Sequence, residues 1–110
     1  MDAKIKSSLL DILICIKEID DFIGENRDFF TYKSDLKTKK AVERNLEIIG
    51  EAVNRIMKLD DKFPISNAKY IVGTRNRIIH SYDNISDEII WTIVNRELPE
   101  LKNEVLKYLD

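Results

Sequence analysis

The sequence predicts an all-α protein, an up-and-down bundle of four to five helices that forms one domain over residues 1–110. Glycine and proline together account for only five residues, far fewer than a fold with many tight turns would need. Hydrophobic residues make up 44% of the chain and charged residues 35%, which suits one apolar core under a charged surface. Apolar residues also recur at steps of three and four, the spacing that places them on one face of a helix.

The first helix is predicted over residues 3–23, with Gly24 as its C-terminal stop. Its core face consists of Ile5, Leu9, Ile12, Leu13, Ile16, Ile19 and Ile23. Leu10 and Ile14 fall on the opposite face, which indicates either a second core layer from a neighbouring helix or a contact in a dimer. Cys15 lies at the edge of the core face and is predicted to act as a small buried hydrophobic residue.

Residues 26–34 are predicted to form a loop in which Phe29, Phe30 and Tyr32 pack onto the helices. A second long helix follows over residues 35–59, with a core stripe of Val42, Leu46, Ile49, Val53, Ile56 and Met57. Asn45 falls on this apolar side, where a polar side chain needs a partner. It either bonds a neighbouring backbone group or supports a functional site.

A third helix is predicted over residues 67–79, after a break at residues 60–64. Ser86 then has the character of an N-cap for the last helix, and Asp87 and Glu88 in its first turn suit the helix dipole. Apolar residues continue this helix to Leu109, with a kink or restart expected at Pro99.

The composition also excludes several classes of protein. The apolar runs are too short for a membrane helix, and the first 22 residues do not have the pattern of a signal peptide. One cysteine and one histidine provide neither an internal disulfide nor a zinc cluster, so we expect a cytoplasmic protein with no metal and no cofactor. The net charge of −2 does not by itself indicate a nucleic-acid partner.

The third helix carries the residues of chemical interest. A helical wheel places Arg75 in the middle of an apolar cluster formed by Ala68, Ile71, Val72, Ile78 and Ile79. A guanidinium there is costly unless it is paired or reaches a cleft. Asn76 and His80 are four residues apart and share a flank of this face. If the helix ends near residues 79–81, extended backbone would bring Tyr82 to the same side as His80.

An arginine beside the only histidine suits cleavage of RNA by its own 2′-hydroxyl, a reaction that needs no metal. It requires a base, an acid and a cation to stabilise the charged phosphorane. One histidine per chain does not easily supply both acid and base, which favours a site shared by two chains of a dimer. The structural alternative is that His80 caps or packs at the helix end and that Arg75 pairs with Glu47 or Glu51.

The run Arg75-Asn76-x3-His80-x-Tyr82 resembles the signature of the HEPN superfamily, and the chain resembles the HepT-like toxins within it. The likeness extends to residues 43–52, which begin Glu-Arg44-Asn45-Leu-Glu, to residues 72–77 and to residues 97–102. This resemblance implies an all-α homodimer that cleaves RNA as the toxin of a two-gene toxin–antitoxin system. Arg75 and His80 would be catalytic, supported by Asn76, Asn45 and Arg44.

The same resemblance implies that the partner is a minimal nucleotidyltransferase antitoxin, which inactivates the toxin by transferring AMP to Tyr82. A phosphate on Tyr82 would place negative charge beside Arg75 and His80 and compete with the RNA phosphate.

Two other functions fit the chain less well. It could be a non-catalytic helical subunit that binds and regulates a nucleotidyltransferase. It could instead be a nucleotide-transferring enzyme itself, but it lacks a Gly-Ser pair followed by spaced aspartates that would hold two metal ions. The acidic pairs at residues 20–21 and 60–61 lie at predicted helix ends, where solvation explains them.

Overall fold

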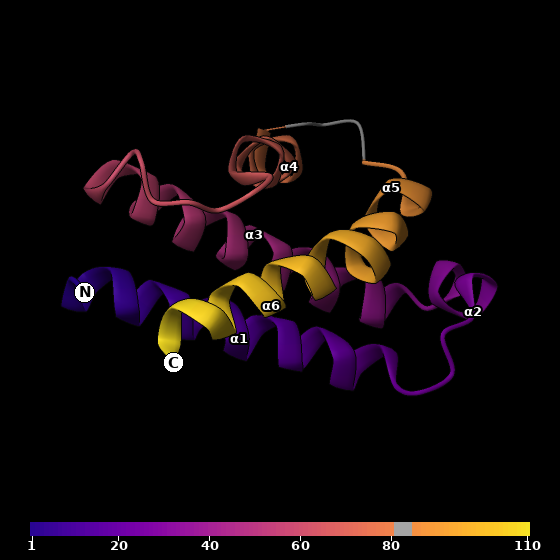
Figure 1. The fold of residues 1–110 in the computed structure, drawn as a ribbon. Coiled ribbons are helices and arrows are strands. Elements are labelled where there is room, and N and C mark those ends of the chain that lie inside the picture. Colours follow the sequence, from indigo (N-terminus) through magenta and orange to yellow (C-terminus); the bar gives the residue numbers. More distant parts are fainter. Residues whose placement is uncertain (81–84) are drawn as a thin grey trace.

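The computed structural model describes residues 1–80 and 85–110, and within these ranges the chain is helical with no strand (Figure 1). The elements are α1 (Ala3–Ile23), α2 (Phe29–Ser34), α3 (Leu36–Leu59), α4 (Ala68–His80), α5 (Asp87–Thr92), the π-helical turn η1 (Ile93–Glu97) and α6 (Leu98–Leu109). Because α5, η1 and α6 follow one another without a break, they act as one bent helical stretch. The predicted all-α fold and the predicted long helices are confirmed.

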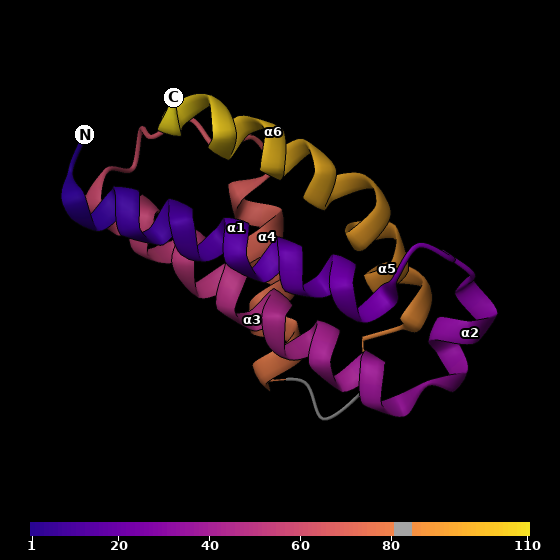
Figure 2. The same cartoon turned by 90° about the horizontal axis from the view of Figure 1, so that it is seen from below.

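The long helices α1 and α3 run antiparallel and in contact, and they form the base of the bundle (Figures 1 and 2). α4 crosses α3, and α6 packs on α1, so that the core lies between α1, α3 and the C-terminal stretch. The side chains with the deepest burial come from α1, α3, α5 and α6: Leu9, Ile12, Ile19, Val42, Ile49, Val53, Ile56, Ile90, Leu101 and Val105. Most residues of the stripes predicted for α1 and α3 are therefore in the core, whereas Leu13, Ile23 and Met57 are partly buried and pack against it.

The ends and the faces of α1 follow from its sequence. Asp2 caps its first turn by accepting a hydrogen bond from the Lys4 amide at 2.6 Å, and Gly24 ends it with φ +79°, a conformation that favours glycine. Cys15 is buried, as predicted, and burial raises the pKa of its thiol to about 11. Leu10 and Ile14 are 44% and 58% exposed. The expectation that another helix of the chain covers them is therefore wrong for the residues that the structure describes.

The predicted loop over residues 26–34 is wrong in its second half, which forms the short helix α2. Asp28 provides the N-cap, because its carboxylate accepts hydrogen bonds from the amide and the hydroxyl of Thr31 at 3.0 and 2.7 Å. These hydrogen bonds hold the pKa of Asp28 below its usual value. Tyr32 is buried as predicted, whereas Phe30 is 74% exposed and does not pack into the core.

The last helical stretch begins as predicted, with the hydroxyl of Ser86 accepting a hydrogen bond from the Ile89 amide at 3.2 Å. The expected kink at Pro99 takes the form of a π-helical turn, in which the Leu98 amide bonds the carbonyl of Ile93. A proline has no amide hydrogen to donate, and the wider turn just before it accommodates that loss. None of the helices in the described ranges is both long and apolar enough to cross a membrane.

Candidate active site

Helices α3 and α4 come into close contact at Gly50 and Arg75. A β-carbon added to Gly50 would lie 2.2 Å from Cβ and 2.7 Å from Cγ of Arg75, and 3.4 Å from the carbonyl oxygen of Ile71. The aliphatic part of Arg75 therefore lies directly on the backbone of α3. Only glycine leaves this space, so Gly50 determines where the arginine emerges from the helix pair.

The guanidinium of Arg75 is half-buried and only partly used within the protein. Its Nη1 donates a hydrogen bond to Oδ1 of Asn76 at 2.9 Å. Its Nε is buried and has no hydrogen-bond partner among the described residues. The alternative in which Arg75 pairs with Glu47 or Glu51 is not observed, because no ion pair of Arg75 is present in the described ranges. The guanidinium therefore keeps N–H donors that can bind an anionic group.

Asn76 and His80 are both exposed and lie one helical turn apart, on the flank of α4 where the wheel placed them. The predicted apolar cluster needs one correction. Ala68, Ile71 and Thr74 are the buried residues of α4, and Ile79 is 40% exposed. Thr74 enters the interface because its hydroxyl donates to the Tyr70 carbonyl at 2.9 Å and is thereby satisfied when buried.

The remaining predicted site residues of α3 bond to other groups on α3. Asn45 is buried, and its amide nitrogen donates to the carbonyl of Ala41 at 2.9 Å, which is the backbone bond considered for it. Arg44 is exposed and pairs with Glu47 at 2.7 Å, an interaction that raises the pKa of the Arg44 guanidinium above its ordinary value. Tyr82 lies outside the described residues.

The contribution of Gly50 was missed by reasoning from the sequence, although one signal pointed to it. A glycine in the interior of a 24-residue helix is unfavourable for the helix and usually has a packing reason. Helical spacing cannot reveal which residue of another helix lies above it. That assignment depends on the angle at which α4 crosses α3.

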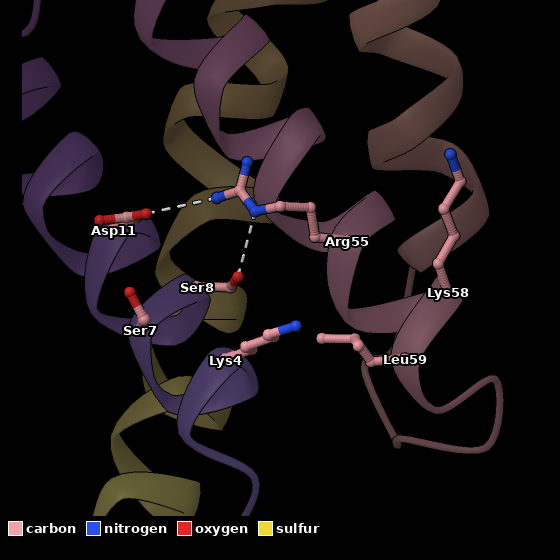
Figure 3. Close-up of a pocket in the computed structure, with 7 residues that line it drawn as sticks. All are labelled: Lys4, Ser7, Ser8, Asp11, Arg55, Lys58 and Leu59. Carbon is pink, nitrogen blue, oxygen red and sulfur yellow. Dashed lines mark hydrogen bonds and ion pairs between the residues drawn. The ribbon is translucent and has the colours of Figure 1, made fainter.

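A surface pocket of about 650 Å³ lies away from this site, between the start of α1 and the end of α3 (Figure 3). Arg55 is engaged there, donating to the hydroxyl of Ser8 and to the carboxylate of Asp11, both at 3.3 Å. None of the residues that line this pocket belongs to α4. Within residues 1–80 and 85–110, no group of three His, Cys, Asp or Glu side chains is arranged to hold a metal ion.

Comparison with known proteins gives a consistent result. Residues 12–108 match the family model described as ribonuclease HepT-like. A protein of Methanocaldococcus jannaschii, whose name describes it as a candidate RNase, is 38% identical over 92% of this chain and 84% of its own length. The probable ribonuclease HepT of Thermococcus cleftensis is 33% identical over 93% of each chain. No solved structure gives a significant match. The chain belongs to the HepT-like ribonuclease family of the HEPN superfamily.

Proposed function

We propose that this protein is a metal-independent endoribonuclease in which Arg75 and His80 are the catalytic residues and Asn76 supports Arg75. The observation that carries the proposal is the placement of Arg75. A half-buried arginine is held over Gly50 one and a half turns before the only histidine, with one nitrogen on Asn76 and another without a partner among the described residues. Membership of a ribonuclease family supports RNA as the substrate.

The two side chains suit attack of a ribose 2′-hydroxyl on the adjacent phosphate. A base removes the 2′ proton as the new P–O bond forms, and an acid protonates the 5′ oxygen as its bond to phosphorus breaks. The products are a 2′,3′-cyclic phosphate and a 5′-hydroxyl. His80 provides proton transfer, and the fixed charge of Arg75 stabilises the phosphorane. The test is incubation of RNA with the purified protein and a chelator. Cleavage is expected, and a strict need for added divalent metal would contradict the proposal.

The reaction needs an acid and a base, and each chain has one histidine, so we propose that a symmetric homodimer brings two copies of the site together. The exposed Leu10 and Ile14 on α1 provide an apolar contact for it. Light scattering should give the mass of a dimer for the wild type and of a monomer for Leu10→Glu/Ile14→Glu, because burying two carboxylates in the contact is costly. A wild-type monomer at the concentration used for cleavage would contradict the shared site.

We further propose that the protein is the toxin of a toxin–antitoxin pair and that a minimal nucleotidyltransferase antitoxin inactivates it by transferring AMP to Tyr82. The new phosphate would stand two residues from His80 and offer an anion to Arg75 in place of RNA. Incubation with such a partner and ATP should add the mass of AMP to the Tyr82 peptide. Tyr82→Phe should remain unmodified, and a modified peptide elsewhere would overturn this assignment.

A further inference from the structure

The surface formed by α2 and the first turns of α3, residues 29–40, has a composition unlike the rest of the chain. It contains four lysines and one aspartate, whereas the remaining residues include 14 basic and 19 acidic side chains. It also carries Phe30, whose 74% exposure is the highest of the large hydrophobic residues in the described ranges. We propose that this basic–aromatic surface, defined as residues 29–40, binds single-stranded RNA, with Phe30 stacking on a base and Lys37 and Lys40 contacting phosphates.

The ring of Phe30 is exposed, but neighbouring aromatic side chains support it. Its ring meets Phe29 edge-on with centroids 5.7 Å apart, and Phe29 in turn contacts Trp91 at 6.0 Å. An aromatic ring that stays in water does not contribute the free energy that burial in the neighbouring core would provide. An exposed aromatic ring that is supported by other aromatic side chains is suited to stack on an unpaired nucleobase.

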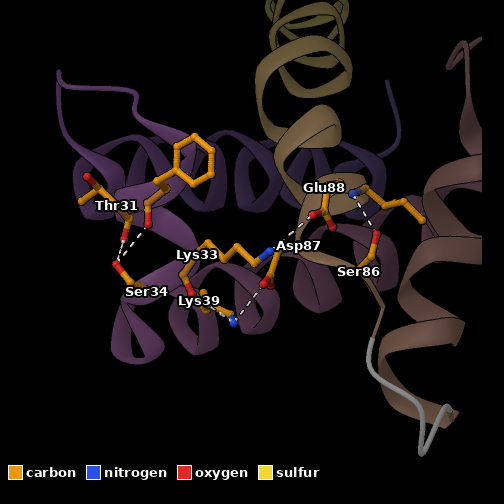
Figure 4. Close-up of polar contacts among 9 residues, drawn as sticks. Thr31, Lys33, Ser34, Lys39, Ser86, Asp87 and Glu88 are labelled. Atoms are coloured by element: carbon orange, nitrogen blue, oxygen red, sulfur yellow. Dashed lines mark hydrogen bonds and ion pairs between the residues drawn. The ribbon is translucent and has the colours of Figure 1, made fainter.

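Two of the four lysines are occupied within the protein. Lys39 pairs with Asp87 at 3.1 Å and Lys33 with Glu88 at 3.7 Å, so both connect this surface to the start of α5 (Figure 4). Lys37 and Lys40 are exposed and form no ion pair with any described residue. They lie three residues apart on α3, hence on neighbouring positions of one face. Of the four lysines, these two have no ion-pair partner in residues 1–80 and 85–110 and can contact a ligand.

The lysines are also unfavourable for the helix that carries them. The first turn of a helix favours acidic residues, yet α3 has none there and has Lys37 at its second position. The lysines thus depart from this preference, and no ion pair with another described residue compensates for it at Lys37 or Lys40. Such departures are expected where a residue serves binding rather than folding.

The surface lies near the proposed catalytic residues. The five residue steps from His80 to Ile85 span at most about 18 Å, and Asp87 follows two residues later in contact with Lys39. α2, the start of α3 and α5 lie at one end of the molecule, and the two chain ends lie at the other (Figures 1 and 2). A strand bound at Arg75 and His80 can therefore continue across this surface. The inference rests on the proposed ribonuclease function.

The test measures fluorescence anisotropy of a labelled, fully 2′-O-methylated RNA, which binds but lacks the 2′-hydroxyl needed for cleavage. Each phosphate contact by a lysine contributes about fivefold at 0.1 M relative to 1 M salt, so Lys37→Glu/Lys40→Glu should weaken binding about 25-fold. The salt slope should fall by about 1.4. The control Lys6→Glu/Lys107→Glu makes the same change of charge at the other end of the molecule and should keep wild-type affinity within a few-fold.

Phe30 is tested separately. Phe30→Ala should weaken binding by about fivefold or more, because it removes one stacked base. Leu36→Ala, which removes a neighbouring apolar side chain that is 62% exposed but cannot stack, should not. Equal effects of the lysine pair and its control, or of Phe30→Ala and Leu36→Ala, would overturn the inference. This assay measures binding and not cleavage, so the two proposals can fail separately. If the variants of this surface lose binding but cleavage does not depend on Arg75 and His80, the proposed function is refuted and the RNA-binding surface is supported.

Discussion

Replacing Arg75 or His80 by alanine should lower the rate of RNA cleavage at least about a hundredfold. Removing a general acid or base typically costs a factor of 10² to 10⁴, and removing a group that stabilises the charged transition state costs about 10² to 10³. His80 is exposed at the end of α4, so its loss removes no core packing. Circular dichroism should therefore show unchanged helix content in the His80→Ala protein.

Arg77 provides the matched control for Arg75. It lies on the same helix two residues later and is exposed, whereas Arg75 rests on Gly50. Arg77→Ala removes the same charge. The fold reduction in cleavage rate that it causes should be at least about tenfold smaller than the reduction caused by Arg75→Ala. Similar rates for the two variants would show that the position of Arg75 has no catalytic importance. Full activity of both Arg75→Ala and His80→Ala would show that neither residue is catalytic, whereas no cleavage by the wild type would favour a non-catalytic regulatory subunit.

Gly50→Ala is expected to destabilise the protein and to displace Arg75. The new β-carbon would lie 2.2 Å from Cβ of Arg75, and neither atom can rotate away because each is fixed by its helix backbone. α4 must therefore move off α3. Overpacking of this kind lowers the free energy of unfolding by about 1–3 kcal/mol, and the displacement of Arg75 should reduce cleavage as well.

Gly73→Ala is the control for that change. Gly73 also lies inside a helix, but apart from the backbone of its own helix and its chain neighbours a β-carbon there meets no atom of the described residues within 4 Å. Alanine is the better helix former, so this variant should gain about 0.5–1 kcal/mol of stability in urea unfolding. The two substitutions should thus have opposite signs. If Gly50→Ala were as stable as Gly73→Ala, the close contact between α3 and α4 would not be what positions Arg75.

The sequence was sufficient for the helices because their signals are local. The apolar spacing of α1 and α3, Gly24 at the end of α1 and Ser86 at the start of α5 each depend on residues within one or two turns. α2 was missed because its cap, Asp28 with Thr31, lies in a segment too short for a periodic pattern to appear. The same limitation led to the wrong expectation that Phe30 would be packed against the helices.

The candidate site could be predicted only in part. The wheel of α4 correctly placed Arg75 toward its neighbours and His80 on the flank, since both positions depend on one helix. It could not show that Arg75 lies over Gly50, or that Asn45 bonds its own helix while Arg44 pairs with Glu47 on the surface. Those facts depend on how α3 and α4 cross and on the rotamers chosen there. Tertiary packing, rather than propensity, decides them.

The chemistry of the fragment ends tests the central claim most directly. RNA cleaved by the wild-type protein in the presence of a chelator should be analysed by mass spectrometry. Attack by the 2′-hydroxyl, with His80 in proton transfer and Arg75 on the phosphate, predicts fragments that end in a 2′,3′-cyclic phosphate and begin with a 5′-hydroxyl. Fragments with a 3′-hydroxyl and a 5′-phosphate would mean that water attacked the phosphate, and they would contradict this account.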